Sequence, residues 1–398
     1  TVFRDSEFSA DMGSRSVKRV EDVAFLKTVQ FAEDAGPMAH SVRPDSYMEI
    51  SNFYTVTIYE KGAEVVRMIR QIIGPANFRK GADLYFGRHD GEAVTTEEFV
   101  RAMEEVSGVD LNQFRLWYSQ AGTPELRVSG SYNKKEQLFT LSIDQNCPAT
   151  PAQPEKKPFY IPMRVGLLDQ EGNELPLVTD FEILRQGSAT DKIFPITESS
   201  QQIVFRGIEA EPVPSLLRSF SAPVKLEYAY TREELFFLMV HDTDGFNRWN
   251  ASQLLAIDVI AELQLSDTSQ NLEIPSILRQ AFTGVMKRAL TEKEIDKAMV
   301  AHLLMLPTES FLIEQAQSAD VDMIHATRER VLNHLSSELF ELFAKIYQEN
   351  ESKTEYTINA KSIAQRSLKN LALGYLVRSG EEEWLEKCSR QFREANNM

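Results

Sequence analysis

Two tyrosines five residues apart, Tyr54 and Tyr59, are the side chains of this sequence that are best placed to do chemistry. Tyr59 stands where the polar and aromatic stretch 48–58 meets a predicted helix, and a tyrosine at a helix start can direct its hydroxyl, a hydrogen-bond donor, into a cleft. Gly62 and Ala63 in the first turn would let another element approach closely. The same residues also fit a second interpretation, in which the tyrosines are packing aromatics and the two small residues mark a tight helix contact.

The common motifs of metal and nucleophilic catalysis are absent from the sequence. None of the six histidines is followed by Glu and no two lie four residues apart, so the chain contains no HExxH zinc motif. Cys147 and Cys388 lack the spacing of metal ligands, and no GxSxG, P-loop or GxGxxG motif occurs. His325 and His334 lie in a helical stretch, where isolated histidines usually have surface or structural roles. Composition and spacing alone therefore leave the activity open.

The charge balance is acidic, with 43 Lys and Arg against 59 Asp and Glu and a formal net charge of -16. Such a surface repels phosphate backbones and anionic lipids, so we expect neither nucleic acid nor a membrane as a partner. The simpler interpretation is that acidity keeps the protein soluble. Two cysteines far apart in sequence argue against a disulfide framework, so we expect a reducing compartment, the cytoplasm.

The 398 residues predict two or three domains. No apolar run approaches the roughly 20 residues that cross a bilayer, and no signal peptide opens the chain. The chain begins at Thr1 and ends at Met398 without a closing signal of its own. We therefore expect both ends to be cuts through a longer protein, in which case the missing signal peptide says little about that parent protein.

Residues 1–122 are predicted to be mainly helical. Apolar side chains at helical spacings predict one buried helix face, formed by Val65, Val66, Met68, Ile69, Ile72 and Ile73. Gly74 and Pro75 predict the end of that helix. Thr95, followed by the acidic residues 97–98, predicts the start of another helix.

Residues 123–222 change to the period of two that is typical of half-buried strands. The strand candidates are 125–128, 138–143, 161–168 and 203–205. A proline-rich loop covers 148–158, and 169–173 is predicted to be a hairpin turn. We therefore expect a small antiparallel β domain of the sandwich type.

From residue 223 to residue 398 the helical pattern returns. Its apolar clusters lie at 235–239, 254–260, 303–306 and 335–346. Successive amphipathic helices with short links predict a helical array or superhelix. No fixed-period repeat is evident, so the sequence indicates no named repeat family.

The segment around the two tyrosines resembles the Y-x-K-G-A motif of the M1 zinc aminopeptidases. That motif corresponds here to residues 59–63, and the flanking residues 52–55 and 64–68 strengthen the match. Further similar stretches are 1–5, 31–35, 40–45, 117–124 and 220–226. The resemblance covers essentially the whole chain and is closest to the bacterial aminopeptidase N branch of the family.

The resemblance implies a multidomain α+β protein in the domain order that the sequence patterns suggest. Residues 1–122 would be the C-terminal part of a thermolysin-like catalytic domain, mainly helical. Residues 123–222 would be a small β-sandwich domain. Residues 223–398 would be the N-terminal part of an α-helical superhelix domain, which would be incomplete at Met398.

The resemblance also implies a zinc metalloaminopeptidase that removes N-terminal amino acids from peptides with a zinc-activated water. Tyr59 matches the family tyrosine that stabilises the oxyanion of the transition state, and Tyr54 matches a tyrosine that lines the pocket for the first substrate side chain. The zinc ligands would lie upstream of Thr1 in the parent protein, so no residue of this chain is expected to bind metal or another cofactor. We expect the isolated chain to be inactive, and the parent to be a cytoplasmic monomer acting on peptides.

The alternative is a catalytically inactive M1-like protein that serves as an interaction scaffold, for which a helical array with an acidic face is suited. The presence of Tyr54, Tyr59 and the sequence 61–63 argues against it, because a scaffold has no need of an oxyanion donor. The presence or loss of HExxH upstream of Thr1 separates the two hypotheses.

Overall fold

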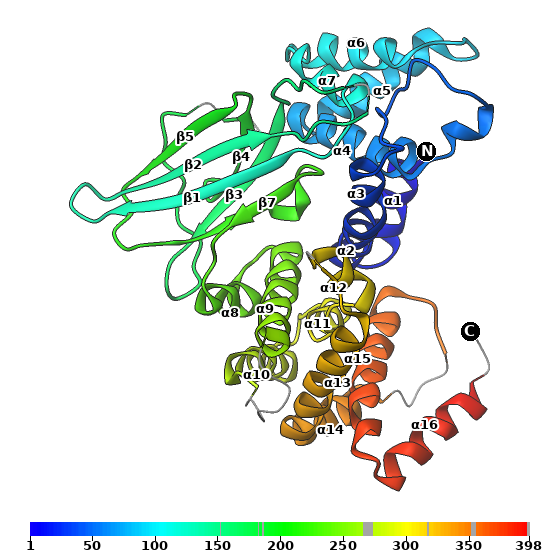
Figure 1. Cartoon of the computed structure of the whole chain (residues 1–398), viewed down its shortest axis with the longest axis vertical. Coiled ribbons are helices and arrows are strands. Elements are labelled where there is room, and N and C mark those ends of the chain that lie inside the picture. The colour runs from blue at the N-terminus through cyan, green and yellow to red at the C-terminus, as the bar shows by residue number, and fades with distance from the viewer. Residues whose placement is uncertain are drawn as a thin grey trace. The chain divides into compact units, whose positions relative to one another are not determined.

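A computed structural model shows how the chain folds into two compact units. The first comprises residues 1–7 and 21–229, and the second comprises residues 8–20 and 230–398. Helices and two β-sheets form the first unit, and the second contains only helices among its described residues, so the predicted mixed α+β class is confirmed (Figure 1). The structure describes residues 1–151, 153–181, 183–184, 187–265, 274–316, 318–351 and 356–395.

The chain starts with two helices, α1 (Val2–Met12) and α2 (Arg15–Phe25), each of which has residues in both units. The other α-helices of the first unit are α3 (Phe31–Ala35), α4 (Gly62–Ile73), α5 (Pro75–His89), α6 (Thr96–Ser107) and α7 (Leu116–Ser119). Short 3-10 or π-helical turns complete this part of the unit: η1 (Leu26–Gln30), η2 (Ile50–Phe53), η3 (Thr57–Lys61) and η4 (Gln113–Arg115).

One predicted end of each of two helices is confirmed, whereas the start predicted at Tyr59 is not, because the π-helical turn η3 begins at Thr57 and α4 begins at Gly62. Val65, Met68 and Ile69 on α4 are fully buried, as their helical spacing requires. The helix ends before Gly74, whose φ of 83° is a backbone conformation that glycine adopts without strain. Thr95 starts α6 through a capping box with Glu98, in which the side chain of each residue accepts a hydrogen bond from the backbone amide of the other.

In the part of the chain that the structure describes, seven strands form two sheets. They are β1 (Glu125–Asn133), β2 (Leu138–Asn146), β3 (Ile161–Leu168), β4 (Asp191–Ile196), β5 (Ser200–Arg206), β6 (Val213–Leu216) and β7 (Lys225–Tyr228). The strand orders are β5-β2-β1-β7 and β4-β3-β6. Phe194 of β4 and Phe205 of β5 meet edge to face with ring centroids 5.7 Å apart, so side chains from the two sheets share one core.

Two features of the β domain differ from the prediction. The domain is not wholly antiparallel, because β7 pairs parallel to β1 with Glu125 opposite Lys225. This strand also lies beyond residue 222, at which we placed the end of the domain. Strand β3 is buried along almost its whole length and is not half-buried, because 3-10 turn η5 (Arg218–Phe220) and α4 contact it in addition to its neighbours in the sheet. The predicted turn at 169–173 is confirmed, since the Asp169 amide donates to the carbonyl oxygen of Asn173.

Trp117 joins the helices of the first unit to its sheets. Its side chain is fully buried, its indole N–H donates to the carbonyl oxygen of Tyr160 at 2.8 Å, and its ring lies 4.5 Å from that of Phe159. A buried indole needs such a partner for its N–H. The end of the helical segment is therefore fixed to the strand that follows the proline-rich loop.

The second unit is a succession of helices. They are α8 (Arg232–His241), α9 (Gly245–Leu265), α10 (Ser276–Thr291), α11 (Lys297–Leu303), α12 (Glu309–Gln315), α13 (Val321–Glu338), α14 (Phe340–Glu349), α15 (Ala360–Leu376) and α16 (Glu382–Glu394), with the 3-10 turn η6 (Val377–Ser379). The rings of Phe343 and Tyr375 stack at 4.2 Å between α14 and α15. Burial raises the pKa of the Tyr375 hydroxyl, which donates to the carbonyl oxygen of Leu304 at 2.8 Å. None of the described helices is long and apolar enough to span a membrane.

The predicted helical stretch 303–306 is helical only at its first residue. Helix α11 ends at Leu303, and the buried Leu304 and Leu306 belong to the link before α12. Pro307 explains the difference, because a proline disfavours helical backbone at the residue before it. Apolar spacing therefore identified the buried residues here but not their secondary structure.

Gly166 should be sensitive to substitution, because a methyl group there would collide with Cζ of the buried Arg218. The Arg218 guanidinium cannot easily move, since it is held by Ser215 at 2.8 Å and Glu174 at 2.7 Å. We expect Gly166→Ala to lower the free energy of unfolding by about 1–3 kcal/mol. Urea unfolding measures the change.

Gly87→Ala is the control, because Gly87 lies in α5 with nothing within 4 Å of the added carbon. There alanine should stabilise the helix by about 0.5–1 kcal/mol. Equal effects of the two variants would contradict the role given to Arg218.

Candidate functional site

The structure brings the two predicted site residues, Tyr54 and Tyr59, together at the surface. Their rings stack with centroids 6.1 Å apart and an angle of 23° between the planes. Within this chain Tyr54 is 71% exposed and Tyr59 is 43% exposed. Within the described part of the chain no hydrogen bond involves either hydroxyl, which leaves both available to a ligand.

Tyr59 is the central residue of the π-helical turn η3, which leads directly into α4. The two ends of this turn, Thr57 and Lys61, are buried, whereas Tyr59 faces solvent. A second π-helical turn, η1, contacts η3. Turns of this kind are rare and occur frequently at functional sites.

A buried ion pair anchors η3 on the side of the turn that faces the protein interior. Lys61 Nζ lies 2.6 Å from Asp34 Oδ2, and the side chains are 1% and 0% exposed. The same ammonium donates to the carbonyl oxygen of Gly122 at 2.9 Å, and Thr123 Oγ1 donates to Asp34 Oδ2 at 2.9 Å. Three segments that are distant in sequence, α3, η3 and the start of the β domain, therefore meet at one pair of charges.

The charge state of Asp34 follows from its neighbours. Burial raises the pKa of the Asp34 carboxyl, but the charge and hydrogen bond of Lys61, together with other hydrogen bonds, outweigh burial and hold it below its ordinary value. A carboxyl whose pKa is lowered by folding stabilises the protein above its unfolded-state pKa. This stabilisation is lost as the pH falls through the lowered pKa of the folded state.

Sequence reasoning did not find Asp34 or the structural role of Lys61. Lys61 lies in the motif at 59–63 and Asp34 in the similar stretch 31–35, but no local rule pairs residues 27 positions apart. The expectation for Gly62 also needs correction. A methyl group at Gly62 would lie 3.5 Å from Val42 Cγ1, which is an ordinary contact, so close packing does not require glycine there.

The described residues contain no group of three or more His, Cys, Asp and Glu side chains that could hold a metal ion. His325 is exposed, and its Nδ1 lies 2.7 Å from Glu309, which raises the pKa of this imidazole. The ligand chemistry of zinc, with several such groups converging on one point, is therefore not met by this part of the protein.

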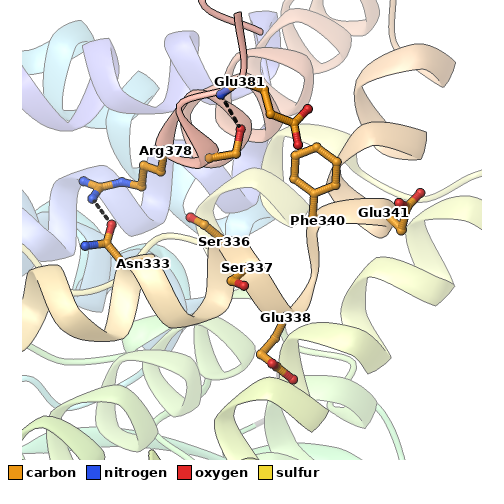
Figure 2. Close-up of a pocket in the computed structure, with 9 residues that line it drawn as sticks. Asn333, Ser336, Ser337, Glu338, Phe340, Glu341, Arg378 and Glu381 are labelled. Atoms are coloured by element: carbon orange, nitrogen blue, oxygen red, sulfur yellow. Dashed lines mark hydrogen bonds between the residues drawn. The ribbon is translucent and has the colours of Figure 1, made fainter. Parts of the chain in front are cut away.

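A pocket of about 460 Å³ lies in the second unit between the α13–α14 junction and η6 (Figure 2). It is lined by Asn333, Ser336, Ser337, Glu338, Phe340, Glu341, Arg378, Ser379 and Glu381. Arg378 already binds Glu329 and Asn333 at 2.8 and 2.9 Å, and Figure 2 shows Glu338 and Glu341 pointing apart. The pocket contains neither predicted site residue and no paired acid and base that would indicate catalysis.

Comparison with known proteins places these features in a family. Residues 1–118 match the peptidase family M1 domain, residues 122–229 match a domain of unknown function with an Ig-like fold, and residues 232–398 match a domain of unknown function with ARM repeats. Aminopeptidase N of Escherichia coli is 44% identical over 400 residues, and that of Haemophilus influenzae is 40% identical over 399 residues. Each alignment covers 100% of this chain.

A crystal structure of Legionella pneumophila aminopeptidase A in complex with aspartic acid has the same fold, with a TM-score of 0.82 and 26% identity. The aligned region covers 100% of this chain and 43% of the Legionella chain. This chain belongs to the M1 peptidase family. Within the family it is a homologue of aminopeptidase N, and it spans 45% of the length of the Escherichia coli relative.

The matches confirm the predicted β domain between two helical regions, add that its fold is Ig-like, and correct one expectation. The helical region matches ARM repeats, although no fixed period was evident in its sequence. Repeats of this kind preserve the pattern of buried positions more than the identity of residues, so unequal helices can hide them.

Removing one member of the buried pair should destabilise the first unit more than removing both. Asp34→Leu leaves the Lys61 ammonium buried without its counter-charge, and Lys61→Met leaves the Asp34 carboxylate in the same state. Each single variant should lose about 3–5 kcal/mol of unfolding free energy, and the double variant should recover much of that loss. Urea unfolding of the unaltered protein, the two single variants and the double variant gives a double-mutant cycle. Additive losses of unfolding free energy would show that the two side chains do not act as a pair.

Proposed function

We propose that this chain is part of a zinc aminopeptidase and that the Tyr59 hydroxyl donates a hydrogen bond to the oxygen of the reacting peptide carbonyl. The observation that carries the proposal is the position of Tyr59. It is half-exposed beside Tyr54, on a turn that the Lys61–Asp34 pair holds from behind. The similarity of this whole chain to 45% and 44% of the lengths of two aminopeptidases N supports the reaction class.

The chemistry of the donor follows from the reaction. When water adds to the scissile carbonyl, its oxygen becomes an oxyanion, and a donor already aimed at that oxygen stabilises the transition state. A phenol suits this role because it keeps its proton at neutral pH. The donor contributes to rate because the hydrogen bond is stronger in the transition state than in the ground state.

Tyr54 is proposed to line the pocket for the first side chain of the substrate. Its ring is the more exposed of the stacked pair and so presents an aromatic face to a ligand. Aromatic rings contribute large contact areas in binding pockets. This role concerns selectivity among first residues and not the rate of bond cleavage.

The M1 family uses zinc, which polarises a carbonyl and activates water when it is bound. Because residues 1–5 resemble the stretch that follows the third zinc ligand in the family, we propose that HExxH and a third Glu precede Thr1 in the full-length protein. The substrates would be peptides, and the protein a cytoplasmic monomer. An interaction scaffold stays the alternative, and the ARM-repeat match is the feature in its favour.

The isolated 398-residue chain should bind no stoichiometric zinc and hydrolyse no aminoacyl anilide, whereas the full-length protein should do both. The physical reason is that the proposed ligand set lies outside the chain. Metal analysis and an anilide assay on both proteins make the comparison. Chelator-sensitive turnover by the isolated chain would overturn this placement of the ligands, and a zinc-free full-length protein would favour the scaffold.

Tyr59→Phe in the full-length protein should lower kcat while zinc content, folding and KM change little. The variant removes one preorganised donor, and such losses cost about 10²–10³ in kcat, or ~3–4 kcal/mol. Steady-state kinetics on an alanyl and an arginyl substrate measure the effect.

Tyr54→Phe is the matched control, since it removes the neighbouring hydroxyl and keeps the ring. It should change the preference between the two substrates more than the maximal rate. A normal kcat for zinc-loaded Tyr59→Phe would show that Tyr59 is not the oxyanion donor.

A further inference from the structure

We infer that Glu33 is a positioning residue for Tyr59, because its carboxylate holds the first residue of the turn that carries this tyrosine. The inference rests on the proposed function and adds a residue to it. Glu33 lies in the similar stretch 31–35, but no sequence pattern linked it to its partner Thr57, 24 positions later.

One oxygen of Glu33 accepts two hydrogen bonds from the same residue. Glu33 Oε2 lies 2.7 Å from the Thr57 amide nitrogen and 2.5 Å from Thr57 Oγ1. Gln30 Nε2 donates to Thr57 Oγ1 at 3.2 Å, so this hydroxyl both donates and accepts. Hydrogen bonds to a charged acceptor are roughly twice as strong as neutral ones.

Glu33 accepts the hydrogen bond of the Thr57 amide, the first amide of η3. The first amides of a helical turn lack partners within the turn, and a side chain just before it usually caps them. Thr55 Oγ1 accepts a hydrogen bond from the Ile58 amide at 3.2 Å, whereas Val56, the residue directly before η3, has no side chain that could accept one from the Thr57 amide. The cap on the Thr57 amide comes instead from α3.

Two consecutive residues of α3 therefore hold both ends of η3. Glu33 binds Thr57 two residues before Tyr59, and Asp34 binds Lys61 two residues after it. With both ends held from one short helix, the backbone of Tyr59 cannot rotate or slide without breaking one of the contacts. A displacement of about 1 Å can cost as much as 10²-fold in rate, so such a clamp has a direct consequence for an oxyanion donor.

The two contacts differ in what their loss should do. The Lys61–Asp34 pair is fully buried and also binds Gly122 and Thr123, so its loss damages the fold. Glu33 is only partly buried, and the bonds that carry this inference end on Thr57. Its loss should therefore loosen the turn and leave the unit folded.

A double-mutant cycle in the full-length protein tests the inference. Glu33→Ala should lower kcat about tenfold or more with KM within about twofold, and Glu33→Gln should restore most of the rate because its amide oxygen still accepts both bonds. In the Tyr59→Phe background Glu33→Ala should have little further effect, because the hydroxyl that it positions is gone. A multiplicative loss in the double variant, or a normal kcat for folded Glu33→Ala, would overturn the inference.

Glu98→Ala is the matched control. Glu98 Oε2 accepts hydrogen bonds from the amide and the hydroxyl of Thr95 at 2.9 and 2.6 Å, the same pairing of groups at the start of α6. Its removal should leave kcat unchanged. An equal loss for Glu98→Ala would mean that general weakening of helix caps, and not the position of Tyr59, explains the effect.

Amide hydrogen exchange gives a readout that does not depend on activity. Exchange over residues 57–61 should accelerate in Glu33→Ala while α6 stays protected. If Glu33→Ala does not fold, Thr57→Val, which removes the hydroxyl at constant size, should show the same exchange and kcat changes, and unchanged behaviour there would overturn the inference. A normal kcat for Tyr59→Phe with faster exchange in Glu33→Ala would instead refute the proposed function alone.

Discussion

The ion pair between Lys61 and Asp34 is the contact on which the first unit depends. It is buried on all sides, and it joins α3, the turn η3 and the residues that enter the β domain. Removing two charges from water costs free energy, and the pair recovers that cost only if its geometry is good and its remaining hydrogen-bonding groups have partners. Here Gly122 and Thr123 each add one hydrogen bond to the pair, whereas Asp34 Oδ1 is buried without a hydrogen-bond partner among the described residues. The pair therefore joins three segments of the chain at one point.

This constraint explains how an exposed tyrosine can be held in a defined position. A side chain that meets a ligand must lie at the surface, where packing cannot hold it, so its backbone must be held from the interior. Thr57 and Lys61 point inward from the turn and Tyr59 points outward. Chemistry and rigidity are thus divided between alternate positions of a single five-residue turn. The widened π-helical backbone accompanies this arrangement, as it does at many functional sites.

The β domain is tied to the same centre. Gly122 binds Lys61, and the next residues lead into β1, which pairs with both β2 and β7. Trp117 of α7 donates a hydrogen bond to the carbonyl oxygen of Tyr160, directly before β3, and so fixes α7 to the β domain. The helical segment and the sandwich therefore belong to one compact unit, which contains both the match to the M1 peptidase domain over residues 1–118 and the match to the Ig-like domain over residues 122–229.

The sequence by itself determined the features that depend on neighbouring residues. The periodicity from Val65 to Ile73, the Thr95 cap and the motif at 59–63 were readable because helix spacing, capping and family motifs are local. Only the tertiary structure decided the partners of Lys61 and Thr57, the parallel pairing of β7 and the burial around Gly166. Each of these joins residues tens of positions apart, and burial, charge and space select among such pairings only once the chain has folded.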